Sequence, residues 1–161
     1  MMRISFTGMI KKDKNKQLVY AAGVFDLLHI GHVRYLQKAK SMGDELIVGL
    51  LTDEGTARYK PYKPIIPYEQ RYEVLMSLRC VDYIVRQYDT DPTSTFMELA
   101  LAHKMIPDIL VRGDDCVGVP PGSEWIEAAG GVVVKISYTQ EVSDSKIKQE
   151  IVKKWNMADM K

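Results

Sequence analysis

Two histidines, His29 and His32, stand three residues apart, after a buried-strand pattern and at the start of a helical one. A helix N-terminus offers free backbone N–H groups and a partial positive charge, which suit a phosphate. Gly31, between the histidines, would let the backbone approach a phosphate oxygen with no Cβ in the way. Two imidazoles can donate hydrogen bonds to phosphorus-bound oxygens as charge builds in a transition state. The spacing therefore favours phosphoryl-group chemistry.

The same pair has plainer readings. The two histidines could be incidental loop residues, or they could be ligands of a metal ion. A metal site needs a third ligand, and the remaining histidine, His103, lies on a distant expected helix. On the pair alone, these readings stay open.

The wider segment Gly23-Val24-Phe25-Asp26-Leu27-Leu28-His29-Ile30-Gly31-His32 resembles the signature of the cytidylyltransferase-like nucleotidyltransferases, His-x-Gly-His preceded by Gly-x-Phe-Asp. With Leu-Leu before the first histidine, it is most similar to the glycerol-3-phosphate cytidylyltransferases and the heptose-1-phosphate adenylyltransferases. The resemblance extends from about residue 18 to residue 151. It implies direct attack of a substrate phosphate on the α-phosphorus of a nucleoside triphosphate, with Mg²⁺ bridging the phosphates, in a homodimer.

A basic loop and an arginine follow the second expected strand. Lys60 and Lys63 lie on a proline-stiffened loop, from which mobile ammonium groups can reach an anion. Arg71 opens the next helix, and its guanidinium fork matches phosphate oxygens. By the resemblance, these residues contact the triphosphate and the substrate phosphate. The alternatives are a solvated lysine loop and an ordinary surface ion pair for Arg71.

Two further segments lie where strands are expected to end. Gly113-Asp114-Asp115 resembles the turn of the glycerol-3-phosphate enzymes more than that of the heptose enzymes, although it could also be a plain acidic turn. The stretch 137–147 resembles the family's triphosphate-binding segment, from which it departs at Tyr138, Glu141 and Asp144. Serines at the start of the last helix would also cap it. Acid beside a triphosphate is costly unless it faces a cation, so Asp144 is expected to point away or toward magnesium.

The resemblance assigns catalysis to His29, His32, Lys60 and Arg71. It assigns nucleotide binding to Gly23, Val24, Phe25, Asp26, Gly31, Lys63, Gly113, Asp114, Asp115, Thr139, Ser143 and Ser145. Mg²⁺ is the expected cofactor, with no protein ligand assigned, and Asp26 is expected to position a histidine or the waters of the metal. The favoured reaction transfers CMP from CTP to a small phosphorylated alcohol or phosphonate. The alternatives are adenylyl transfer from ATP to a sugar phosphate or FMN, and a nucleotide-binding regulatory module without catalysis.

Short apolar runs alternate with amphipathic stretches along the chain. Strands are expected at 18–22, 45–51, 81–85, 108–111 and 132–136, and helices at 33–42, 67–78, 93–103, 123–129 and 143–154. This alternation predicts an α/β fold in one domain, a Rossmann-like, doubly wound parallel sheet of five strands. Such sheets bind ligands outside the carboxyl ends of their strands, where the histidine motif and the Gly113 turn lie.

Composition narrows the class of protein. The 161 residues fit one domain, and a net charge of +1 gives no electrostatic case for nucleic-acid binding. No apolar run is long enough to cross a bilayer, and two cysteines without a CxxC pattern point to a reducing compartment. A cytoplasmic enzyme without membrane contacts is therefore expected. Residues 1–17, rich in lysine, are expected to form a flexible basic arm before the nucleotidyltransferase domain at 18–161.

Overall fold

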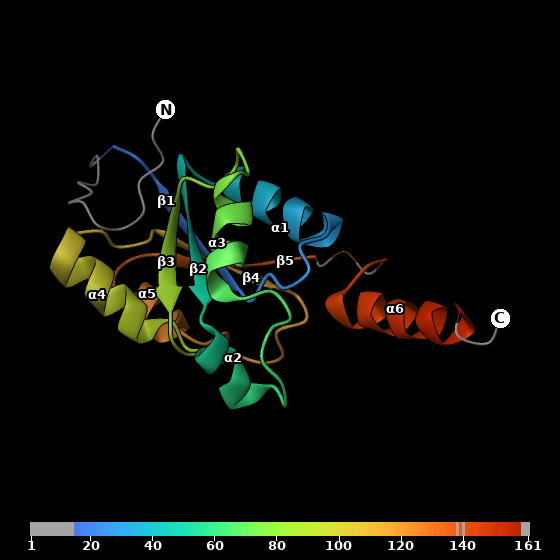
Figure 1. Cartoon of the computed structure of the whole chain (residues 1–161). Helices are drawn as coiled ribbons and strands as arrows, with labels where there is room; N and C mark the ends of the chain where they lie inside the picture. The colour runs from blue at the N-terminus through green and yellow to red at the C-terminus, as the bar shows by residue number, and fades with distance from the viewer. Residues whose placement is uncertain (1–14, 138, 140, 159–161) are drawn as a thin grey trace.

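The computed structural model describes residues 15–137, 139 and 141–158 (Figure 1). The strands are β1 (Leu18–Gly23), β2 (Glu45–Leu51), β3 (Tyr83–Gln87), β4 (Ile109–Gly113) and β5 (Val132–Ile136). The helices are α1 (Ile30–Lys40), α2 (Asp53–Tyr59), α3 (Tyr68–Met76), α4 (Thr93–His103), α5 (Ser123–Ala128) and α6 (Asp144–Ala158).

All five strands run parallel in one sheet, in the order β3-β2-β1-β4-β5. The chain winds outward from the central strand β1 through β2 to β3, then returns to the other side of β1 for β4 and β5. The order therefore reverses between β1 and β4, and a crevice forms there at the carboxyl ends. The expected Rossmann-like, doubly wound sheet is confirmed.

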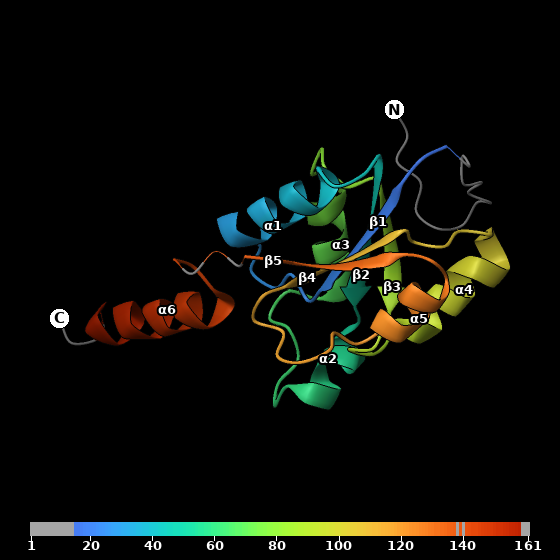
Figure 2. The same ribbon diagram turned by 180° about the vertical axis from the view of Figure 1, so that it is seen from behind.

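Helices cover both faces of the sheet, which explains the nearly all-apolar strands. Side chains alternate along β1: Val19 and Ala21 belong to the core under α1 and α3, whereas Leu18 and Tyr20 belong to the core under α4 and α5. Figures 1 and 2 show these two pairs of helices on opposite sides of the sheet. Helix α6 instead projects from the body of the protein beyond the carboxyl edge (Figures 1 and 2).

Three elements differ most clearly from the sequence predictions. No helix was predicted over residues 53–59, but α2 forms there, and Thr52 caps it by accepting a hydrogen bond from the Gly55 N–H at 2.9 Å. The third strand begins at Tyr83, which pairs with Ile47, because Val81 is still in the turn after α3 and bonds back to Leu78. Helix α1 begins three residues before the predicted residue 33, within the histidine motif.

The predicted basic arm is described only at its end. Residues 1–14 lie outside the described part of the chain. Lys16 pairs with Glu45 at 2.7 Å, and the Gln17 N–H donates to the Asp44 carboxylate at 2.8 Å. The last residues assigned to the arm are therefore attached to the start of β2.

Candidate active site

The turn between β1 and α1 contains two residues with left-handed backbone. Phe25 and Leu27 have φ angles of 53° and 45°, in the left-handed region that is costly for residues with a Cβ. The Phe25 ring folds back over Gly23, where an added Cβ would lie 2.8 Å from the ring. Strained backbone of this kind clusters at functional sites and requires support from its surroundings.

His29 is the N-cap of α1. Its backbone is extended, and its Nδ1 accepts a hydrogen bond from the Gly31 N–H at 3.1 Å. The imidazole lies so close to Gly31 that an added Cβ there would come within 2.9 Å of the ring. Gly31 is therefore needed to make room for the cap, rather than directly for a phosphate oxygen as the sequence suggested.

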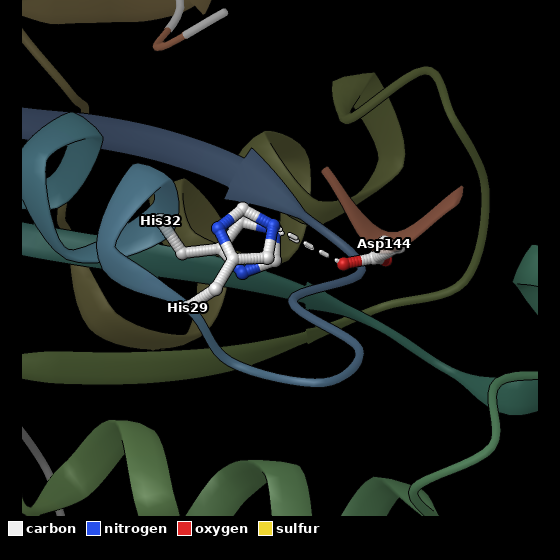
Figure 3. A group of neighbouring side chains, drawn as sticks. All are labelled: His29, His32 and Asp144. Atoms are coloured by element: carbon white, nitrogen blue, oxygen red, sulfur yellow. Dashed lines mark ion pairs between the residues drawn. The ribbon is translucent and has the colours of Figure 1, made fainter. Parts of the chain in front are cut away.

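His32 stacks on His29, with ring centroids 3.8 Å apart and planes 19° apart (Figure 3). Phe25 meets the His32 ring edge-on at 5.3 Å. Burial, aided by the neighbouring His29, lowers the pKa of His32 to about 3. His32 is therefore neutral near pH 7, and it offers hydrogen bonds rather than a positive charge.

Asp144, the first residue of α6, points at both histidines (Figure 3). Its Oδ1 lies 3.3 Å from Nε2 of His29 and 3.9 Å from Nε2 of His32. Burial and the nearby Asp26 raise the pKa of its carboxyl group above the ordinary value. Of the two orientations expected for Asp144, away from the site or toward magnesium, the first is wrong, because the carboxylate faces both histidines.

Asp26 binds three segments of chain together. Its carboxylate accepts hydrogen bonds from the N–H groups of Leu27, Ile65 and Ile66 at 2.9–3.1 Å and from Lys148 Nζ at 3.0 Å. Burial alone would raise the pKa of Asp26, but these donors outweigh it and lower the pKa below the ordinary value. Its oxygens are committed to the protein, so Asp26 positions the loops rather than a metal ion or its waters.

Lys148 was missed by the sequence analysis. It lies four residues after Asp144 on α6, and its Nζ sits 4.8 Å from the centre of the Tyr62 ring. Residues four apart share a helix face, so the spacing of Asp144 and Lys148 could have indicated that both lie on the same side of α6. Through these two residues, α6 contacts both the histidine pair and the loop that follows α2.

Arg71 lies elsewhere than expected. Its side chain is 1% exposed, and it donates to the carbonyl oxygens of Val24, Leu51 and Ile66 and to Asp53. The guanidinium joins the ends of β1 and β2 to the start of α3. This buried ion pair differs from both earlier readings, a phosphate contact and a surface pair, because its donors are directed at protein oxygens.

The two loop lysines have different surroundings. Lys60 is the C-cap of α2, is half-buried, and is close enough to help lower the pKa of His32. Lys63 is exposed and pairs with Glu54 at 3.6 Å. Lys60 is therefore the lysine nearer to the histidines.

A cavity of about 350 Å³ opens at the carboxyl ends of β1 and β4, beside His32. Several predicted residues line it: Gly23, Val24, Phe25, His32, Gly113 and Asp115. Asp114 is exposed, and its N–H donates to Ile136 at the end of β5. Tyr35 and Arg112 also line the cavity and were missed, although Tyr35 is three residues from His32 and so shares its helix face.

Ser143 and Ser145, at the start of α6, have different surroundings. Ser143 accepts a hydrogen bond from the Lys146 N–H at 3.3 Å and so acts as a cap. Ser145 is exposed in the first turn of the helix, and Thr139 is half-buried. Tyr138 lies outside the described residues, so its departure from the family pattern has no structural account.

His29, His32 and Asp144 together present two nitrogen ligands and one oxygen ligand within 4.8 Å of one another. This donor set suits a transition metal better than Mg²⁺, which prefers oxygen ligands in octahedral geometry. Within the described part of the chain, no other such group of three is present. Mg²⁺ would therefore have to be held mainly by phosphate oxygens and water.

The sequence model of the cytidylyltransferase-like family matches residues 20–151. The chain belongs to this family. The match spans nearly the whole sheet, the histidine pair and the start of α6, so the chain has the fold of this nucleotidyltransferase family.

Two curated relatives and one solved structure are similar to this chain. The bifunctional protein HldE of Citrifermentans bemidjiense is 40% identical over 141 residues, which are 86% of this chain, and that of Geobacter sulfurreducens is 40% identical over 146 residues, or 89% of this chain. This chain spans 28% of the length of each of them. A lipopolysaccharide core biosynthesis protein from Thermoplasma volcanium has a similar solved structure, with a TM-score of 0.64 and 32% identity over 78% of this chain and 99% of that one.

Helices that could span a membrane are absent from the described residues.

Proposed function

We propose that this protein transfers an adenylyl group from ATP to a sugar phosphate and releases pyrophosphate. The observation that carries the chemistry is the stacked histidine pair at the N-terminus of α1, beside the cavity between β1 and β4. The choice of reactants is supported by the HldE relatives and the lipopolysaccharide protein, which favour the heptose-type resemblance over the glycerol-3-phosphate type. This reverses the preference for CTP drawn from the Gly113 turn.

The proposed reaction is a single displacement. An oxygen of the acceptor phosphate bonds to the α-phosphorus of ATP, and the bond from that phosphorus to the bridging oxygen of pyrophosphate breaks. The attacking phosphate is already an anion, so no general base is needed. His29 can donate a hydrogen bond from Nε2 as charge builds on the α-phosphate, because its Nδ1 is taken by the Gly31 N–H.

In the proposed reaction, Mg²⁺ would enter the site bound to the nucleotide. Mg²⁺ on the triphosphate would neutralise charge on the leaving pyrophosphate and keep much of its water shell. Among this chain's residues, Lys60 and the first turn of α6, with Ser143 and Ser145, would hold the phosphates. ATP also requires a compartment supplied with nucleotides, which fits the cytoplasmic location expected from composition.

A pyrophosphate-release screen tests the reaction. We expect release with ATP and a heptose or hexose 1-phosphate to exceed release with CTP by at least about tenfold, equivalent to roughly 1.4 kcal/mol of discrimination between the two bases. Glycerol 3-phosphate and FMN serve as competing acceptors. Reactions without an acceptor measure background hydrolysis.

Two other outcomes of the screen would contradict the proposed reaction. Faster release with CTP and glycerol 3-phosphate would reverse the choice of nucleotide and acceptor. Binding of ATP without release in any combination would favour the regulatory module.

We also propose that the protein is a homodimer, with α6 at the contact between subunits. The projecting helix exposes Ile151, Val152 and Trp155, with exposed fractions of 54–70%. Ile151 and Trp155 are four residues apart and so share one face. Exposed apolar patches of this kind mark interaction surfaces.

We expect sedimentation velocity to show that the native chain is a dimer at tens of micromolar. A specific interface should hold in this concentration range. Trp155→Glu is expected to give a monomer, because it places a charge in the apolar face. Lys154→Glu changes the charge of the neighbouring position and serves as the control, with a dimer expected. A monomeric native chain would contradict the proposal.

A further inference from the structure

The Asp144 carboxylate lies beside His29 without forming a hydrogen bond to it. Its Oδ1 and Nε2 of His29 are both buried, and within the described residues neither forms a hydrogen bond, although they are 3.3 Å apart. The His29 side chain is 6% exposed and directed at this carboxylate (Figure 3). Buried polar groups without hydrogen bonds are uncommon and call for a physical reason.

The tautomer of His29 identifies what kind of group it faces. Its Nδ1 accepts a hydrogen bond from the Gly31 N–H, so in neutral His29 the proton is on Nε2. A metal ion at Nε2 would need the proton on Nδ1, where it would oppose the Gly31 N–H. The histidine therefore presents a donor to an anion, and the donor set is arranged for an oxyanion rather than for a cation.

In the proposed reaction, the Nε2–H group of His29 is also the donor to the α-phosphate. Carboxylate and phosphate oxygens are both anionic acceptors, and two anions within reach of one donor repel each other. We propose that Asp144 is an internal competitor of the nucleotide: in the free protein its carboxylate holds the place of a phosphate oxygen, and the nucleotide must displace it. This rests on the proposed function only for the identity of the displacing ligand.

Displacement of Asp144 would involve more than one side chain. Asp144 begins α6, Ser143 caps the helix, and Lys148 one turn later pairs with Asp26. Helix α6 packs extensively against none of the other described helices and strands, and it projects from the body (Figures 1 and 2). Its first turn is therefore the element that shifts when a phosphate enters. The apparent affinity is reduced by the fraction of molecules in which Asp144 holds the site.

The test is tripolyphosphate binding by isothermal titration calorimetry in the presence of EDTA, which needs neither a base nor a metal. Asp144→Asn removes the negative charge, and Asp144→Ser supplies a small neutral residue as a second variant. Both are expected to bind tripolyphosphate at least about tenfold more tightly than the native chain. Glu141→Gln is the matched control: it removes one negative charge three residues away, where Glu141 is 84% exposed and 3.9 Å from Arg34, and less than a twofold change is expected.

Three results would overturn the proposal. The first is unchanged or weaker tripolyphosphate binding in both Asp144 variants. The second is equal tightening in the Glu141 control, which would indicate a general charge effect. The third is weaker binding of Mg²⁺–ATP by Asp144→Asn, which would make Asp144 a ligand of the nucleotide's metal. Tighter tripolyphosphate binding with no pyrophosphate release from any reactants would leave the competitor role standing and remove the proposed function.

Discussion

Replacing His29 or His32 by alanine is expected to lower turnover more than a hundredfold. A buried donor aimed at developing negative charge is worth on the order of 3 kcal/mol when it is removed, which is about a hundredfold in rate. The two rings stack at 3.8 Å at the start of α1, where the carboxyl edge of the sheet opens. Pyrophosphate release under saturating ATP and acceptor measures the loss.

Alanine at position 29 also removes the N-cap of α1, so a structural effect must be separated from a chemical one. His29→Asn provides this control, because asparagine is among the best N-cap residues but has no donor at the Nε2 position. We expect His29→Asn to melt close to the native temperature and to remain about as inactive as His29→Ala. Turnover near the native rate in His29→Asn, or in a folded His32→Ala, would remove the histidines from the mechanism.

Replacing Arg71 by methionine is expected to lower the free energy of unfolding by about 3–5 kcal/mol, because breaking a buried ion pair leaves the other partner charged and unpaired. Asp53 and the carbonyl oxygens of Val24, Leu51 and Ile66 would lose the donor that the Arg71 side chain, only 1% exposed, supplies to them. Chemical denaturation measures the change. A loss of this size is a large fraction of the stability of an ordinary domain.

Arg79→Met serves as the control, because Arg79 is exposed in the turn after α3, and a change within about 0.5 kcal/mol is expected. The experiment also separates the two roles of Arg71. An Arg71→Met protein of native stability that has lost turnover would restore the phosphate contact that the resemblance suggested. Loss of stability is the result that the buried position predicts.

Much of the fold was predictable because its signals are local. The strand at Glu45–Leu51 is a nearly all-apolar run, and the helix at Thr93–His103 was predicted with its observed bounds. The errors were at ends and in short elements. Helix α2 has seven residues, too few for a helical repeat to stand out, and its clearest signal was Thr52 as an N-cap before Asp53 and Glu54.

The histidine motif was also predictable, since its chemistry depends on residues adjacent in the chain. His29, Gly31 and His32 share one turn at a helix start, so residue type and spacing favoured a phosphate site, and the resemblance of the whole segment 23–32 chose this reading over the plainer ones. The grouping of Gly23 and Gly113 around one cavity followed from the parallel sheet, because β1 and β4 end at the same edge.

The tertiary structure alone decided what the charged groups around the motif do. Asp26 binds Ile65 and Ile66 about 40 residues later and Lys148 after 122, so its role depends on loops that sequence spacing does not relate. Arg71 could have faced solvent, a phosphate or the interior, and burial between β1, β2 and α3 determined which oxygens it meets. Asp144 depended likewise on where α6 docks. Local sequence determines which groups a segment carries, whereas burial and distant partners determine which atoms each of those groups contacts.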